Sequence, residues 1–295
     1  MTLVQTEPKS IKIWNTPIKK VTIRPNGTEK QIRPVLPKYN WNLANATQDQ
    51  SRQPTSISNN RCIDISSDGL HILLSNEGWP VTEHTLSTAY DLTSTITTKT
   101  ANLKTKSFTD SVCYNDDGTR IYVNNTNSSS QSWSSVIEQR PLSTPFDIST
   151  AWSVTYSKTT DSWYRLWCFR FYDNWTKIIW WTRDGKLVNG SLSTAWRIDT
   201  LWSLTAQVTF WDANTINNGC AISPDGKYFR SITEYKKYIY QFNTNTPYTF
   251  TSTNTGIVTP RNSTWGFWVD ISDDGKYFFV ARQNGYIYRY TFATV

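Results

Sequence analysis

The sequence predicts an all-β protein, a five-bladed β-propeller of four-stranded antiparallel blades, and three observations predict it. A short phrase ending in Asp-Gly, here called the first phrase, recurs at a spacing of about fifty residues. A different phrase, the second phrase, follows each copy. The last repeat lacks its outer half, and residues 41–52, far upstream, match the missing part. Fixed periods of this size are typical of repeat architectures, in which one unit cannot bury its own hydrophobic face.

The first phrase predicts the inner hairpin of each blade. Its Asp or equivalent stands at residues 68, 117, 174, 225 and 274, so the spacings are 49, 57, 51 and 49. Asp-Gly between apolar runs is a strong hairpin signal, because Gly supplies a positive φ and Asp caps the turn. The third copy departs from the pattern, because Asn174 and Trp175 replace Asp-Gly. The sequence therefore does not predict the inner turn of that blade.

The second phrase predicts the outer half of each blade. It reads Leu-Ser-Thr-Ala-Tyr-Asp-Leu at 86–92, and it returns in related form at 142–148 and 192–198 and, more degenerate, at 242–250. An apolar third strand precedes it, and a Thr- and Ser-rich strand follows it. Four short antiparallel strands per repeat are typical of a propeller blade.

The two ends of the sequence predict how the ring closes. The fifth repeat stops at Val295, midway through its second phrase, whereas Trp41 to Thr47 matches the missing part. Residues 41–52 are expected to supply the outermost strand of that blade, which removes exposed sheet edges. We expect an arm at 1–40 and a propeller at 41–295. The expected blades are 53–100, 101–159, 160–210, 211–256, and 257–295 joined by 41–52.

The cysteines and histidines give little support for metal binding or catalysis. Four cysteines (Cys62, Cys113, Cys168 and Cys220) precede the first phrase of successive blades, which places them on innermost strands as buried thiols, and no Cys-x-x-Cys pair occurs. Disulfides are not expected. His71 and His84 are the only histidines, and neither has a ligand-like neighbour. The sequence favours a protein with no enzymatic activity, no cofactor and no metal.

Two carboxylates leave glycoside hydrolysis open as an alternative. The repeated Asp residues are expected to serve their turns. Asp64 and Asp270 lie near the ends of inner strands, where a glycosidase would hold its pair of acids. No stretch approaches the ~18 apolar residues of a membrane span, and no secretory signal opens the chain, so neither a membrane nor the usual export route is expected.

The arm carries nearly all of the net charge. Residues 1–40 hold eight basic and two acidic residues, a net +6 of the total +7. Residues 20–33 read as a small hairpin around Pro25-Asn26-Gly27, and a lone hairpin is barely stable in water. Docking by strand addition to a larger assembly ranks first, ahead of a solvated tail and of nucleic-acid binding. The expected docking residues are Lys19, Lys20, Val21, Ile23, Arg24, Ile32 and Arg33.

The two phrases in alternation resemble the propeller repeats of structural proteins from tailed bacteriophages. Ile222 to Tyr228 resembles their "SPDG" turn, and Leu142 to Ala151 resembles their "LSTPWDVSTA" turn. The arm is similar to short N-terminal segments of phage virion proteins. The resemblance covers nearly the whole chain and implies a virion component, attached to other virion proteins through residues 1–40. It implies no activity and names no ligand.

The face opposite the two phrases is expected to bind a ligand. Its loops are irregular, and variable loops on a rigid scaffold are where binding usually occurs. They place tryptophans near amide and hydroxyl groups, which suits sugars, although such tryptophans also pack between blades. The candidate ligand-binding residues are Trp79, Trp133, Trp163, Trp211, Trp265, Tyr235 and Asn284. Adhesion to a host-surface glycan is the leading hypothesis, capsid, neck or tail decoration without a ligand is the alternative, and glycan hydrolysis comes last.

Overall fold

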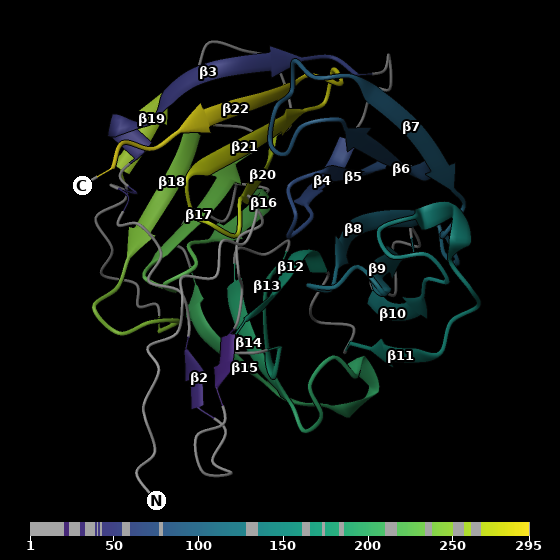
Figure 1. Ribbon diagram of the computed structural model, residues 1–295. Helices are drawn as coiled ribbons and strands as arrows, with labels where there is room; N and C mark the ends of the chain where they lie inside the picture. Colours follow the sequence, from purple (N-terminus) through teal and green to yellow (C-terminus); the bar gives the residue numbers. More distant parts are fainter. Residues whose placement is uncertain are drawn as a thin grey trace, which may run out of the picture. The chain divides into compact units, whose positions relative to one another are not determined.

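Five four-stranded antiparallel sheets make up the propeller in a computed structural model (Figure 1). The structure describes residues 21–23, 30–32, 39, 41, 43–54, 60–76, 79–127, 135–160, 166–172, 175–182, 186–209, 217–233, 238–249, 257–260 and 267–294. Within these residues there are strands and short 3-10 turns and no α-helix. None of the described elements is a helix long and apolar enough to cross a membrane.

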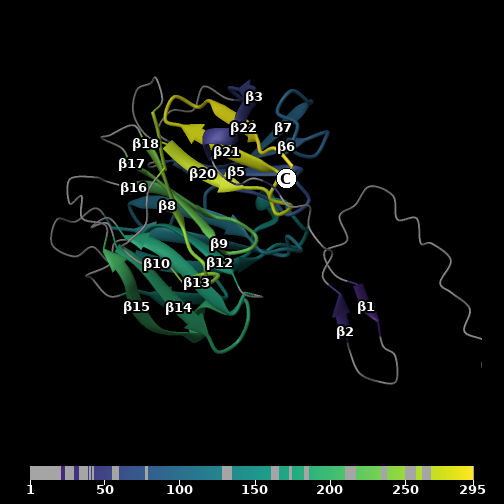
Figure 2. The same ribbon diagram turned by 90° about the vertical axis from the view of Figure 1, so that its left-hand side faces the viewer.

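The chain forms two compact units, 1–37 and 38–295. In the first unit, β1 (Val21–Ile23) pairs antiparallel with β2 (Lys30–Ile32), and Val21 lies opposite Ile32. Figure 2 shows these two strands side by side. The expected hairpin is confirmed.

The first three blades follow one another along the chain. The first blade holds β4 (Asn60–Ile65), β5 (His71–Asn76), β6 (Trp79–Leu86) and β7 (Ile96–Ala101). The second holds β8 (Phe108–Tyr114), β9 (Arg120–Thr126), β10 (Ser135–Pro141) and β11 (Tyr156–Thr159). The third holds β12 (Leu166–Tyr172), β13 (Lys177–Thr182), β14 (Lys186–Leu192) and β15 (Leu201–Thr209).

The fourth blade extends farther along the chain than the sequence suggests. It holds β16 (Asn217–Ile222), β17 (Tyr228–Thr233), β18 (Tyr238–Asn243) and β19 (Ile257–Pro260). Because Tyr238 of β18 pairs with Pro260, the residues from 257 to 260 complete the fourth blade and do not begin the fifth. The expected boundary at 256 therefore moves to the far side of Pro260.

The fifth blade is built from both ends of the propeller. It holds β20 (Phe267–Ile271), β21 (Tyr277–Arg282) and β22 (Ile287–Thr291), and β3 (Thr47–Arg52) adds to β22 as the outermost strand. In Figure 1 the N-terminal β3 lies beside the C-terminal β22. The innermost strands contact one another around a closed circle, in the order β4, β8, β12, β16, β20 and back to β4. The five-bladed propeller closed by an N-terminal strand is thus confirmed.

The two phrases meet at one end of every blade. In the first blade, Tyr90 N donates to Gly69 O over 2.8 Å, and the Tyr90 ring covers the turn. Phe146 and Tyr248 lie over Gly118 and Gly226 in the same way, and Trp41 lies over Gly275 in the fifth blade. The N-terminal half repeat therefore supplies both the missing strand and the missing aromatic side chain.

The third blade has no glycine at the turn of its first phrase. Trp175 adopts the glycine conformation, with a φ of 65°. Its ring stacks on Trp196, the aromatic residue of the second phrase, at 3.7 Å between centroids. Its Nε1 donates to Asp116 Oδ2 of the second blade over 2.8 Å. The turn keeps its shape because a ring–ring stack replaces the close approach of a ring to a glycine.

Repeated hydrogen bonds join neighbouring blades. The acceptor is a side-chain oxygen of one blade, and the donor is the main-chain N–H two residues after the phrase aromatic of the next blade. The pairs are Gln50 with Leu92 (2.8 Å), Glu83 with Ile148 (2.9 Å), Gln139 with Ile198 (3.2 Å) and Gln241 with Leu43 (3.2 Å). The aromatic of the second phrase is therefore fixed at the blade interface as well as within its own blade.

Candidate functional site

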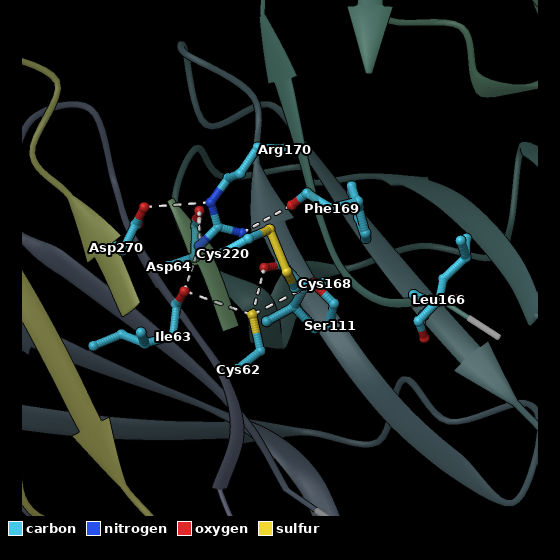
Figure 3. The surroundings of a disulfide bond; sticks show 12 residues. Cys62, Ile63, Asp64, Ser111, Leu166, Cys168, Phe169, Arg170, Cys220 and Asp270 are labelled. Carbon is cyan, nitrogen blue, oxygen red and sulfur yellow. Dashed lines mark hydrogen bonds and ion pairs between the residues drawn. A yellow bond between two sulfur atoms is a disulfide. The ribbon is translucent and has the colours of Figure 1, made fainter. Parts of the chain in front are cut away.

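An arginine that is 12% exposed and two buried carboxylates lie together among the innermost strands (Figure 3). Arg170 comes from β12, Asp64 from β4 and Asp270 from β20. The distance from Arg170 Nε to Asp270 Oδ1 is 3.3 Å, and that from Nη2 to Asp64 Oδ1 is 3.9 Å. Arg170 also donates from Nη2 to the main-chain oxygen of Ile63 over 2.6 Å. One guanidinium therefore links three blades.

The repeat explains why these three residues meet. Each stands four residues before the Asp position of its first phrase, so each occupies the same place on its innermost strand. Cys113 and Ala221 hold this place in the second and fourth blades. Residues at one repeat position converge in a closed ring, although they are far apart in sequence.

The second oxygen of each carboxylate is engaged as well. Asp64 Oδ2 accepts a hydrogen bond from Tyr114 N over 3.0 Å, and Asp270 Oδ2 accepts one from Ile65 N over 2.7 Å. Both bonds run to the innermost strand of the next blade. The two carboxylates thus link neighbouring blades, as the side-chain oxygens of Gln50, Glu83, Gln139 and Gln241 do farther from the innermost strands.

Burial sets the protonation of this cluster. It raises the pKa of Asp64 well above its usual range and raises the pKa of Asp270, while the Arg170 charge opposes both shifts. Burial would lower the pKa of Arg170, but Asp270 and Asp64 raise it, so Arg170 stays charged. A glycosidase needs two carboxyl groups that reach a substrate. Asp64 and Asp270 are only 7% and 6% exposed, and each holds an ion pair with one oxygen and a hydrogen bond with the other, so their geometry fits a structural role.

The Asp residues of the first phrase serve their turns, as expected. Asp68, Asp117, Asp225 and Asp274 each accept a hydrogen bond from the main-chain N–H two residues later, over 2.9–3.0 Å. Each also contacts the Ser or Asn two residues earlier. This Asx-turn geometry accounts for their recurrence.

The two histidines have structural neighbours. His71 Nδ1 lies 3.0 Å from Glu83 Oε1, and the His71 ring stacks on Phe146. His84 is fully buried, its Nδ1 lies 3.0 Å from the Thr98 hydroxyl, and burial lowers its pKa to about 4, so it stays neutral. In the described part of the chain, no three His, Cys, Asp or Glu side chains are grouped as metal ligands would be.

The cysteines lie on innermost strands, but the expectation that all four are thiols is wrong. Cys168 of β12 and Cys220 of β16 form a disulfide between the third and fourth blades (Figure 3). Cys62 and Cys113 are buried free thiols, and burial raises the pKa of both. The absence of Cys-x-x-Cys was misleading because the pair forms across a blade interface, between residues 52 positions apart.

Most of the expected ligand-binding residues lie outside the described residues. This is so for Trp133, Trp163, Trp211, Trp265 and Tyr235, and Trp79 is described only by its backbone, at the start of β6. Among the expected docking residues, Val21, Ile23 and Ile32 lie in the hairpin of β1 and β2. The others, Lys19, Lys20, Arg24 and Arg33, are outside the described residues.

Asn284 is the described residue of the expected ligand face, and an exposed tyrosine accompanies it. It lies in the turn between β21 and β22, where its main-chain oxygen accepts a hydrogen bond from Gln53 Nε2 over 2.9 Å. Tyr286, two residues on, is 36% exposed and stacks on Tyr288. Arg282 covers the Tyr288 ring at 4.2 Å. Sequence reasoning missed Tyr286, although Asn-Gly-Tyr at a hairpin turn is a readable signal.

Two further exposed aromatic residues, Trp152 and Trp202, were not anticipated. They are the most exposed large hydrophobic side chains in the described part of the chain. Both follow a second phrase, in a regular segment and not in one of the irregular loops.

No family model and no curated protein matches the chain. A solved structure, the Cps50 (Swd1) β-propeller domain of Myceliophteria thermophila, is similar with a TM-score of 0.45 and 13% identity, over 79% of this chain and 83% of that chain. This similarity concerns architecture alone.

Proposed function

We propose that this protein is a non-enzymatic structural component of a bacteriophage virion, displayed on the particle through residues 1–40 and used for adhesion to a host-surface glycan. The alternation of the two phrases supports the virion assignment through the resemblance given above. The basic hairpin supports docking, since a two-stranded sheet is stabilised by adding strands to a partner.

One observation carries the preference for binding over catalysis. The two carboxylates best placed for hydrolysis are engaged by Arg170 and by the main chain of the next blade. The described groups exposed on the opposite, irregular face include an aromatic ring, Tyr286, and an amide, Asn284. Sugars stack their CH faces on aromatic rings and hydrogen-bond to amides, so this pair fits a glycan.

The test is a glycan array probed with the full chain and two variants. Tyr286→Ala and Asn284→Ala remove the stacking and the amide group, and each is expected to reduce array binding at least tenfold. Asn245→Ala is the matched control, because Asn245 is an exposed amide at the end of the blades that carries the two phrases. Binding that survives both substitutions would remove this face from the adhesion hypothesis.

Decoration without an external ligand is the second candidate. It is favoured if the wild-type chain folds normally and binds no glycan on the array. Docking has a separate test: particles purified from the source culture should contain the full chain, and a variant lacking residues 1–37 should be absent from them. Detection of the truncated chain in the particles would contradict the docking role of the arm.

A further inference from the structure

The second strand of the fifth blade ends in an arginine that no other blade has at this position. Arg282 stands eight residues after the Asp of its first phrase, at the end of β21. The residues at the same repeat position on the second strands of the other four blades are Asn76, Asn125, Thr182 and Thr233. Since a small amide or hydroxyl side chain serves four blades, the fold itself does not require a guanidinium here.

This arginine is fixed beside the exposed Tyr286. Arg282 N donates to Tyr286 O over 2.8 Å, so the two residues lie opposite each other across the turn, and opposite residues project to the same side of a sheet. The Cζ of Arg282 lies 4.2 Å from the centroid of the Tyr288 ring. That ring is stacked on the Tyr286 ring, with 6.1 Å between centroids and 26° between planes. The guanidinium and the two rings therefore form one continuous series.

Hydrogen bonds from two other segments hold the turn in place. Arg282 O accepts from Gly285 N and from Asn60 Nδ2 of the first blade, each over 3.0 Å. Gln53, which follows the closing strand β3, donates from Nε2 to Asn284 O over 2.9 Å, and both of these residues are exposed. The turn thus presents a ring, two amides and, behind the ring, a guanidinium on a fixed backbone.

A guanidinium stacked on an aromatic ring is suited to an anionic oxygen group. Stacking uses the flat face of the guanidinium, whereas a carboxylate or a phosphate is recognised by the N–H groups at its edge. The charge of arginine is also permanent in proteins. We infer that the glycan is acidic: its CH face stacks on Tyr286, and its carboxylate, phosphate or sulfate group pairs with Arg282. This inference rests on the proposed function, because it names the class of sugar bound at the same turn.

The charge of the chain shapes the test. Residues 1–40 hold +6 of the total net charge of +7, so the arm of the full chain attracts any polyanion. Short oligosaccharides and single-residue variants remove this background, because every variant carries the same arm. The array therefore holds uronic-acid, sialic-acid, phosphorylated and sulfated oligosaccharides. Each stands beside a neutral counterpart, made by esterification of the carboxylate or by removal of the phosphate or sulfate.

The full chain is probed as wild type, Arg282→Gln, Arg282→Lys and Arg197→Gln. Wild type should bind at least one acidic oligosaccharide tenfold or more tightly than its neutral counterpart. Arg282→Gln should weaken binding of that acidic oligosaccharide about tenfold, and Arg282→Lys should weaken it less, because lysine keeps the charge but not the planar fork. Arg197→Gln is the matched control, since Arg197 is also stacked on a tyrosine, Tyr156 at 4.5 Å, but lies at the end of the blades that carries the two phrases. It should keep the full preference. The anionic group on the oligosaccharides that bind identifies the group that Arg282 recognises.

Three outcomes overturn the inference, and they are distinguishable from one another. Equal binding of acidic and neutral counterparts by wild type removes the acidic group but leaves the glycan proposal in place. A preference that survives Arg282→Gln places recognition of the anion elsewhere, with the basic arm as the first candidate. Absence of binding to every oligosaccharide overturns the proposed function and this inference with it.

A measurement on wild type alone keeps the inference testable if Arg282→Gln melts at a lower temperature than wild type. The affinity for the acidic oligosaccharide should fall between 0.05 M and 0.5 M NaCl, because salt screens an ion pair, whereas the affinity for the neutral counterpart should not. The same salt dependence for both counterparts would contradict a pairing of Arg282 with an anionic group.

Discussion

The ring of Tyr90 occupies the space that a side chain at residue 69 would need. A Cβ atom on Gly69 would lie 2.4 Å from Cζ of Tyr90. Gly69 also has a φ of 74°, and Tyr90 itself has a φ of 61°. Two residues in the left-handed region, one from each phrase, therefore form a single unit at the end of the blade. This contact explains why the two phrases recur together.

Gly69→Ala should destabilise the protein by at least about 2 kcal/mol. The strain of a left-handed alanine and the displacement of a packed ring each cost on the order of 1–3 kcal/mol. Chemical denaturation of the two proteins measures the loss.

The double variant Gly69→Ala/Tyr90→Ala separates the two causes. Removing the ring relieves the clash but leaves the positive φ, so the two substitutions should be less than additive. Strict additivity in this double-mutant cycle would mean that Tyr90 does not restrict residue 69.

Much of the fold could be predicted because it is local and repeated. Asp-Gly turns, alternating strands and a displaced half repeat are visible in sequence, and the structure confirms them. The turn at Trp175 could not be predicted, because its stability comes from a stack with Trp196 across the blade. The Cys168–Cys220 disulfide joins two different repeat positions, six and five residues before the Asp position, so it depends on which side of each strand faces the next blade. Small shifts of register decide that, and sequence spacing does not reveal them.

The exposed aromatic residues were harder to predict from sequence than the fold. The binding residues expected from the irregular loops include Asn284, and they do not include the exposed Tyr286, Trp152 and Trp202. The last two lie in regular, repeated segments, where the repeat itself suggests packing. Only their exposure distinguishes them from the buried aromatic residues around them.

Removal of the closing strand should be far more damaging than removal of the arm. A chain lacking residues 1–37 keeps Trp41 and β3, so its melting temperature should stay close to that of the full chain. A chain lacking residues 1–52 exposes the edge of β22 and uncovers Gly275, and we expect it to aggregate. Size-exclusion chromatography and thermal melting test both variants.

Trp41→Ala tests the closure of the fifth blade with a single side chain. It removes the ring over Gly275 and the hydrogen bond from Nε1 to Gly275 O, which is 2.8 Å long. Loss of a buried tryptophan typically costs about 3–5 kcal/mol. A loss below about 1 kcal/mol would mean that the N-terminal segment does not seal the fifth blade.

The disulfide should be detectable by peptide mapping. Under non-reducing conditions, we expect one cross-linked species joining Cys168 to Cys220, whereas Cys62 and Cys113 should react with alkylating reagents only after unfolding, because both are buried. The double variant Cys168→Ala/Cys220→Ala should lose about 2–5 kcal/mol relative to the oxidised protein. Alkylation of all four cysteines in the native, unreduced protein would contradict this pairing.

Arg170→Met should destabilise the protein by about 3–5 kcal/mol, because it leaves two carboxyl groups buried without their cation. Lys99→Met is a suitable control. It breaks a shorter ion pair, 2.6 Å between Lys99 Nζ and Asp147 Oδ2, but Lys99 is 40% exposed, so the loss should stay below about 1 kcal/mol.

The penalty for Arg170→Met should also grow with pH. The pKa values of Asp64 and Asp270 are raised in the folded protein, so the folded state holds their protons more tightly than the unfolded chain does. The stabilisation that comes from these two raised pKa values is complete below the ordinary aspartate pKa of about 4. It is lost as the pH rises through the raised pKa values of the folded protein. Arg170 opposes both shifts, so its removal raises the two pKa values further and moves more of the loss into the neutral range. Urea denaturation at pH 5 and pH 8 should therefore show a larger difference between variant and wild type at pH 8. An equal difference at both values would mean that the two carboxyl groups do not depend on Arg170 for their charge.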